Sequence, residues 1–185
     1  LVKKNRDLST VETEKLLSSV WHEDRMLALL LLIDAYRRGD PAVRQHIYNL
    51  YLRNTRFINN WDLVDVTAQH IVGAYLNLRS KEPLYRLARS EMLWERRIAI
   101  LATFHYIRQG LFDETLRLAE MLLRDEHELI HKAVGWLLRE VGKRSRSAEE
   151  WFLQANYKEM PRTMLRYAIE RFPEALRKKY LQGKI

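Results

Sequence analysis

Apolar residues recur three or four positions apart along almost the whole chain, and no stretch alternates between apolar and polar residues. This pattern predicts an all-α protein, because an α-helix returns to the same face about every 3.6 residues. We expect helices at about residues 10–20, 23–38, 41–54, 60–78, 82–90, 92–108, 111–123, 128–142, 146–156, 160–171 and 173–182.

Residues that cap or break helices stand between the predicted segments. Asp40 followed by Pro41 supplies an N-cap and then a proline at the first helical position. Asn60 supplies a cap directly before Trp61, and Gly39 falls where a helix should stop. The predicted boundaries therefore rest on capping chemistry as well as on periodicity.

Every second predicted helix begins near residue 23, 60, 92, 128 or 160, a period of roughly 32–37 residues. Helix pairs with short loops at this period are typical of an α-solenoid of tandem antiparallel helix pairs, of the HEAT or armadillo kind. We expect one domain over residues 1–185, curved, with a basic concave face lined by equivalent helices. Residue identities between the units are weak, so a compact, non-repetitive helical bundle is the alternative.

Composition excludes several kinds of site. The 185 residues contain no cysteine, which excludes disulfides, thiolate nucleophiles and cysteine-based metal sites and favours a cytoplasmic location. The longest apolar run, residues 26–33, is far too short to cross a bilayer, so we predict no membrane association.

Positive charge gathers in the C-terminal third of the chain. The net charge is +8, and residues 129–185 hold 13 Lys and Arg against 6 Asp and Glu. Of the 32 basic residues 22 are Arg, whose guanidinium suits bidentate contacts with phosphate. This distribution favours a nucleic-acid partner. A surface that is basic only for solubility is the alternative.

The run W-D-L-V-D at residues 61–65 places an indole and a carboxylate on one face of a helix start. Trp61 and Asp65 are four residues apart, so their side chains lie one turn from each other. Such a pair suits a reaction in which positive charge develops at a sugar carbon, because the indole offers a π face and the carboxylate a negative charge. The alternative is a core Trp beside a capping or ion-paired Asp.

Two later segments carry residues of the same kind at about the repeat spacing. Arg97 lies 36 residues after Trp61, and Trp136 lies 39 residues after Arg97 and three before Arg139. In a solenoid these residues would sit on neighbouring parallel helices of one face. Aromatic rings interleaved with Arg are typical of a nucleic-acid groove. A place in the core is the alternative for Trp136.

His127 and His131 match the H-E-x-x-H pattern of zinc peptidases. The pattern begins at a predicted helix start, no later His exists to complete the site, and the only acidic candidates lie in or beyond a polar loop. We therefore predict no metal site and interpret both residues as solvated residues of a helix start.

The segments N-W-D-L-V-D at 60–65, W-E-R-R-I-A-I at 94–100 and H-K-A-V-G-W-L-L-R-E at 131–140 together resemble the DNA alkylation repair (AlkD-like) glycosylases. The resemblance runs in order from about residue 21 to about residue 170. It implies an all-helical protein built from HEAT-like repeats. It also implies additional helices at the N-terminus of the natural protein, because family members carry them.

The resemblance implies a function and a set of site residues. The family excises cationic N3- and N7-alkylated purines from duplex DNA, contacting the deoxyribose and backbone without pulling the base into a pocket. By match to its motifs, Asp65 and Trp61 would be catalytic, and Arg97, Trp136 and Arg139 would contact DNA. We expect no cofactor, no required protein partner and a monomer that binds double-stranded DNA containing alkylated bases. A non-catalytic solenoid that binds DNA or a protein partner is the alternative.

Overall fold

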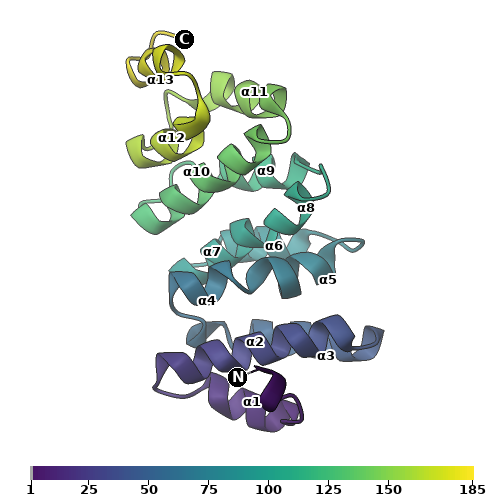
Figure 1. The fold of residues 1–185 in the computed structure, drawn as a ribbon. Helices are drawn as coiled ribbons and strands as arrows, with labels where there is room; N and C mark the ends of the chain where they lie inside the picture. Colours follow the sequence, from purple (N-terminus) through teal and green to yellow (C-terminus); the bar gives the residue numbers. More distant parts are fainter. Residues whose placement is uncertain (1) are drawn as a thin grey trace.

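A computed structural model describes residues 2–185 of the chain, and within them every regular element is a helix. The elements follow one another as a stack from the N-terminus to the C-terminus (Figure 1). None of the helices in this range has the length and apolar character that crossing a membrane requires. In chain order the elements are η1 (Val2–Lys4), α1 (Thr10–Leu17), α2 (His22–Arg38), α3 (Pro41–Arg53), η2 (Thr55–Phe57), α4 (Trp61–Asp65), η3 (Gln69–Gly73), α5 (Ala74–Leu76), α6 (Glu82–Ala88), α7 (Leu93–Ala102), α8 (Phe104–Ile107), α9 (Asp113–Met121), α10 (Glu128–Gly142), α11 (Arg146–Asn156), α12 (Arg162–Ala168), η4 (Ile169–Arg171) and α13 (Glu174–Leu181).

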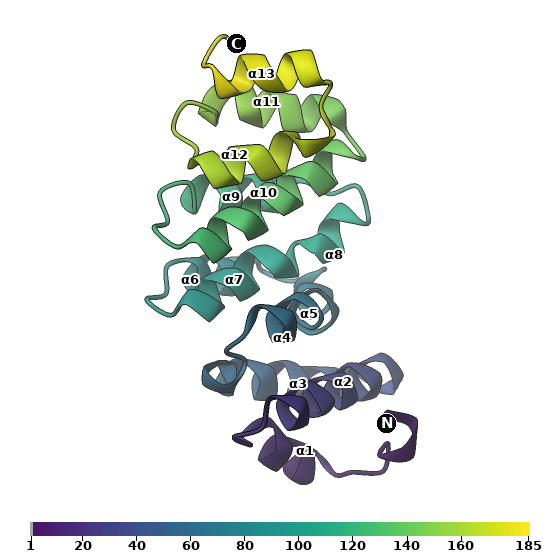
Figure 2. The same ribbon diagram turned by 60° about the vertical axis from the view of Figure 1, so that its left-hand side comes forward.

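The helices form two layers, as the prediction of an α-solenoid requires. We call the helices α2, α4, α7, α10 and α12, with their continuations, the first layer; each packs against the next. The remaining long helices form the second layer, where α1 pairs with α2, α6 with α7 and α9 with α10. All first-layer helices begin on the left-hand side of Figure 1, so their starts form one edge of the stack. Figure 2 shows the same alternation from another side.

Buried apolar side chains from both layers make one continuous core along the stack. Two glycines set how closely first-layer helices approach. A Cβ on Gly73 would lie 2.1 Å from the Ala102 carbonyl oxygen, and one on Gly135 would lie 2.4 Å from that of Met164. Both distances are far shorter than a carbon–oxygen contact allows, so any larger residue would push η3 from α7, or α10 from α12.

The helices predicted at 60–78 and 92–108 are each broken in the structure. The first is divided into α4, the π-helix η3 and α5, and the second into α7 and α8. A buried threonine stands at each break, and its hydroxyl donates to a backbone carbonyl: Thr67 to Leu63 at 2.5 Å and Thr103 to Ile100 at 2.7 Å. These local bonds compete with the regular helical ladder. The remaining predicted helices are present, with ends that differ by a few residues.

The same turn precedes three first-layer helices. A side-chain oxygen of Ser19, Ser90 or Asp125 accepts the backbone N–H two residues later, at the helix N-cap. The carbonyl of that same residue then accepts a hydrogen bond from the side chain six residues later, Arg25, Arg96 or His131. The repeat is therefore visible in hydrogen bonding although the residue identities are weak.

Candidate active site

Four first-layer helices contribute to one open pocket with a volume of about 370 Å³. All five residues that the sequence predicted as site residues line it, together with three that it did not single out. The lining is Trp61 and Asp65 from α4, Arg97 from α7, Leu129, Lys132, Trp136 and Arg139 from α10, and Tyr167 from α12.

The short helix α4 presents its indole and carboxylate to this pocket. The Asn60 side chain accepts the Trp61 backbone N–H at 2.8 Å, which starts the helix at the tryptophan. Leu63 and Val64 are fully buried, so they anchor the opposite side of the helix in the core. Trp61 is consequently 54% exposed and is no core residue, contrary to the alternative considered for it.

The Asp65 carboxylate is held by a bidentate ion pair with Arg97. The guanidinium Nε lies 2.8 Å from Oδ1, and Nη2 lies 2.8 Å from Oδ2. The Asp65 side chain is only 15% exposed. Burial raises the pKa of Asp65 above its ordinary value, and the Arg97 guanidinium opposes that rise by hydrogen bonding and charge. The result is a carboxylate with a fixed orientation at the pocket wall.

Arg97 has a different environment from that of a surface phosphate ligand. Its side chain is 6% exposed, and its third donor group, Nη1, hydrogen-bonds the Leu129 carbonyl at the start of α10. The guanidinium therefore connects α4, α7 and α10. Its role as a DNA contact stays a prediction, whereas its contact with Asp65 is part of the fold.

Two linked hydrogen bonds, from Tyr51 to Thr67 and from Thr67 to Leu63, hold the α4 backbone next to Asp65. The Thr67 hydroxyl donates to the Leu63 carbonyl, so the Tyr51 hydroxyl, 2.8 Å from the Thr67 oxygen, is the donor in their contact. Tyr51 and Thr67 are fully buried. Sequence reasoning missed both residues, although a Thr one turn after Leu63 of the W-D-L-V-D motif is a recognisable signal of a bent helix.

The α10 and α12 side of the pocket combines aromatic rings with paired cations. Trp136 is half-buried and packs at a tilt on Phe104, with ring centroids 5.7 Å apart. Lys132 lies 3.1 Å from a Glu128 carboxylate oxygen. Arg139 pairs with Glu170 and keeps 18% of its side chain exposed. Sequence reasoning did not find Tyr167, which depends on the close approach of α12 at Gly135.

Comparisons with known proteins place this arrangement in a family. The profile of the family described as "DNA alkylation repair enzyme" matches residues 1–172. The chain belongs to this family. Membership places the protein in the repair of alkylated DNA and implies DNA as its partner.

The fold of this DNA alkylation repair family member is similar to that of a solved relative. The structure of a "Predicted DNA alkylation repair enzyme from Enterococcus faecalis" superposes with a TM-score of 0.70 at 16% sequence identity. The match covers 94% of this chain and 81% of that one. No curated protein matches the sequence.

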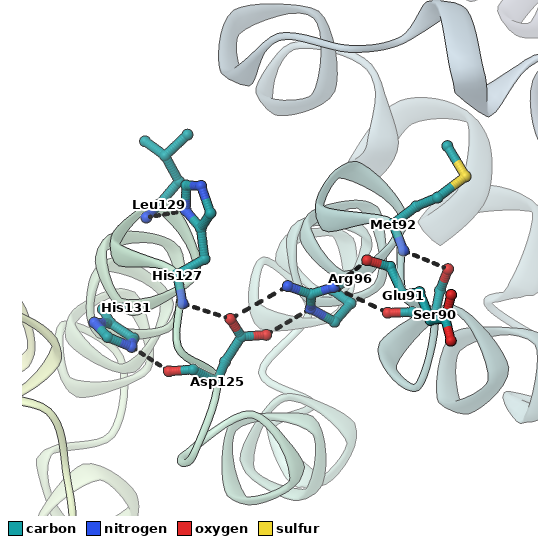
Figure 3. A network of polar contacts seen from close by, with 8 residues as sticks. All are labelled: Ser90, Glu91, Met92, Arg96, Asp125, His127, Leu129 and His131. Carbon is teal, nitrogen blue, oxygen red and sulfur yellow. Dashed lines mark hydrogen bonds and ion pairs between the residues drawn. The ribbon is translucent and has the colours of Figure 1, made fainter.

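In this DNA alkylation repair family member, the two histidines of the H-E-x-x-H pattern serve the start of α10. His127 Nδ1 accepts the Leu129 backbone N–H at 3.1 Å, and His131 Nε2 contacts the Asp125 carbonyl (Figure 3). Asp125 also binds Arg96 of α7, with Nε 2.6 Å from Oδ2. Across residues 2–185 no cluster of three or more His, Asp or Glu side chains is arranged to hold a metal ion.

Proposed function

We propose that the protein is a monofunctional DNA glycosylase that hydrolyses the N-glycosidic bond of cationic alkylated purines, 3-methyladenine and 7-methylguanine, in duplex DNA. One observation carries the proposal: a carboxylate of fixed orientation, Asp65, lies one helical turn from the exposed indole of Trp61 in an open pocket. An open pocket beside a helix start can receive a nucleotide that stays in the duplex.

The chemistry follows from the charge of the substrate. An N-alkylated purine is already cationic, so when the C1′–N bond breaks and its electron pair goes to the base, a neutral purine leaves without protonation. The sugar then carries positive charge, as in glycoside hydrolysis. Asp65 stabilises that charge and orients the water that adds to C1′, and the water's proton passes to the carboxylate. The products are the free base and an abasic site.

The other pocket residues have supporting roles in this scheme. The faces of Trp61 and Trp136 pack on the sugars and stabilise the developing cation. Arg139, part of whose guanidinium side chain reaches the surface, contacts a phosphate that flanks the lesion. Arg97 holds Asp65 in place and is a positioning residue. The reaction needs no cofactor, and we propose that a monomer performs it without a protein partner.

Release of methylated purine from methylated duplex DNA tests the proposal. We expect Asp65→Asn to lower the single-turnover rate by at least about a hundredfold, as loss of a main electrostatic group does. Asp62→Asn is the matched control, because Asp62 lies on the same helix, binds His22 rather than Arg97, and keeps an acceptor oxygen as Asn. This variant should retain most of the rate.

Two results would contradict the proposal. A wild-type protein that binds DNA but releases no base above background is a non-catalytic solenoid. A rate that is equally insensitive to Asp65→Asn and Asp62→Asn would remove Asp65 from the reaction.

A further inference from the structure

The turn before α2 holds an exposed tryptophan in a fixed position. Trp21 is 66% exposed. Its backbone N–H donates to the Ser19 hydroxyl at 3.1 Å, and Arg25 Nη1 donates to the carbonyls of Ser19 and Val20 at 3.0 and 3.1 Å. Three hydrogen bonds thus hold the backbone of this turn while most of the Trp21 residue is exposed to solvent. A large apolar ring held in this way is prepared for a contact outside the fold.

Trp21 lies next to the candidate active site. The residue that follows it, His22, binds the residue that follows Trp61, Asp62, with Nε2 2.8 Å from Oδ2. Helices α2 and α4 pack against each other, and both begin at the edge formed by the first-layer helix starts (Figure 1). The two exposed tryptophans therefore stand at neighbouring helix starts.

The surroundings of Trp21 indicate which part of DNA it would meet. The first turn of α2 carries two carboxylates, Glu23 and Asp24, which repel phosphate, and the nearby Arg25 guanidinium is engaged by the Ser19 and Val20 carbonyls. The ring itself offers an apolar face, which suits a deoxyribose or the face of a base. A sugar contact fits both features, because it needs apolar surface and no positive charge.

We propose that Trp21 is a second aromatic contact of the DNA-binding surface, packing on deoxyribose of the nucleotides that flank the one held at Trp61. This inference rests on the proposed function, because it requires DNA in the Trp61 pocket. It extends the binding surface from α4 to α2 along the edge formed by the first-layer helix starts. On the same edge, Met92 and His127 occupy the N-cap positions of α7 and α10 that correspond to Trp21.

Affinity for duplex DNA, measured by titration of a labelled oligonucleotide, tests the inference. Trp21→Ala should raise Kd about tenfold, the size typical of a lost aromatic contact with nucleic acid. Trp21→Phe should restore most of the affinity. The slope of log Kd against log salt should stay at the wild-type value, because no phosphate contact is lost.

Trp151→Ala is the matched control. Trp151 is 68% exposed, nearly the same as Trp21, but it lies on α11 in the second layer. We expect its removal to leave Kd unchanged. The inference is overturned if Trp21→Ala binds like wild type, if both variants lose the same affinity, or if wild type does not bind DNA. Absence of base release by a DNA-binding wild type would refute the proposed function alone.

Discussion

Replacement of Arg97 by Gln removes the counter-ion of a carboxylate that is only 15% exposed. Removal of one partner of a buried ion pair costs about 3–5 kcal/mol, because the other charge is left uncompensated. The Asp65 carboxylate keeps some contact with solvent, so we expect the lower end, about 3 kcal/mol of unfolding free energy at neutral pH. The loss of the Nη1 bond to Leu129 is included in this figure.

The pH dependence distinguishes loss of a counter-ion from loss of packing. Burial already raises the pKa of Asp65, and without Arg97 nothing opposes the rise. The folded chain then binds the proton more tightly than the unfolded chain, so the variant loses stability as pH rises from the ordinary Asp range through the raised pKa. The deficit relative to wild type should therefore shrink at low pH, where a neutral Asp65 needs no counter-ion.

Urea unfolding at several pH values measures this, combined with a double-mutant cycle. In the Asp65→Asn background, Arg97→Gln should cost clearly less than it does in the wild-type background, since no charge is left unpaired. If the two substitutions are additive, or if the deficit of Arg97→Gln is the same at all pH values, the carboxylate does not depend on Arg97 in the way we describe. Base release by Arg97→Gln should lose activity on the acid side at a higher pH than wild type.

Three further predictions concern other parts of the structure. Gly135→Ala should cost about 1–3 kcal/mol and slow base release, because the new Cβ meets the Met164 carbonyl and shifts Tyr167; a variant with wild-type unfolding and wild-type rate would contradict the close packing. Burial raises the pKa of Glu149 to about 8, so the stability of the wild-type protein should fall as pH rises toward that value. Glu149→Gln should remove this fall. Urea unfolding midpoints of both proteins at pH about 5.5 and about 9 test this. Trp61→Ala should leave the unfolding free energy within about 0.5 kcal/mol of wild type while base release falls, because the ring is exposed; a large loss of stability would make it a core residue.

Periodicity predicted the layers but not the breaks within them. A π-turn changes the helical register by a single residue, which a 3.6-residue pattern of apolar positions cannot reveal. Thr67 and Thr103 mark both breaks and lie 36 residues apart, about one repeat. Helix α10 contains no threonine and is continuous over 128–142, which agrees with threonine hydroxyls causing the breaks. Buried threonines at repeat spacing were therefore the signal that hydrophobic periodicity alone overlooked.

Sequence analysis predicted which residues line the candidate site, but it did not predict the contacts between them. Trp61, Asp65, Arg97 and Trp136 meet in one pocket because equivalent positions of parallel helices face the same side. The pairing of Arg97 with Asp65 depends on how α4 and α7 slide past each other. No spacing within one helix reveals that offset. Tyr167 depends in the same way on the approach of α12.

Under the proposed function, a single guanidinium would make the chemistry of this protein sensitive to mechanical deformation. Arg97, on α7, donates from Nε and Nη2 to the Asp65 carboxylate on α4 and from Nη1 to the Leu129 carbonyl on α10. Flexing the stack so that these helices spread would stretch one set or the other. A duplex that fits only a flexed array would therefore meet an Asp65 partly released from its counter-ion. In such a design the stiffness of the DNA, and not only the identity of the base, would influence the reaction rate.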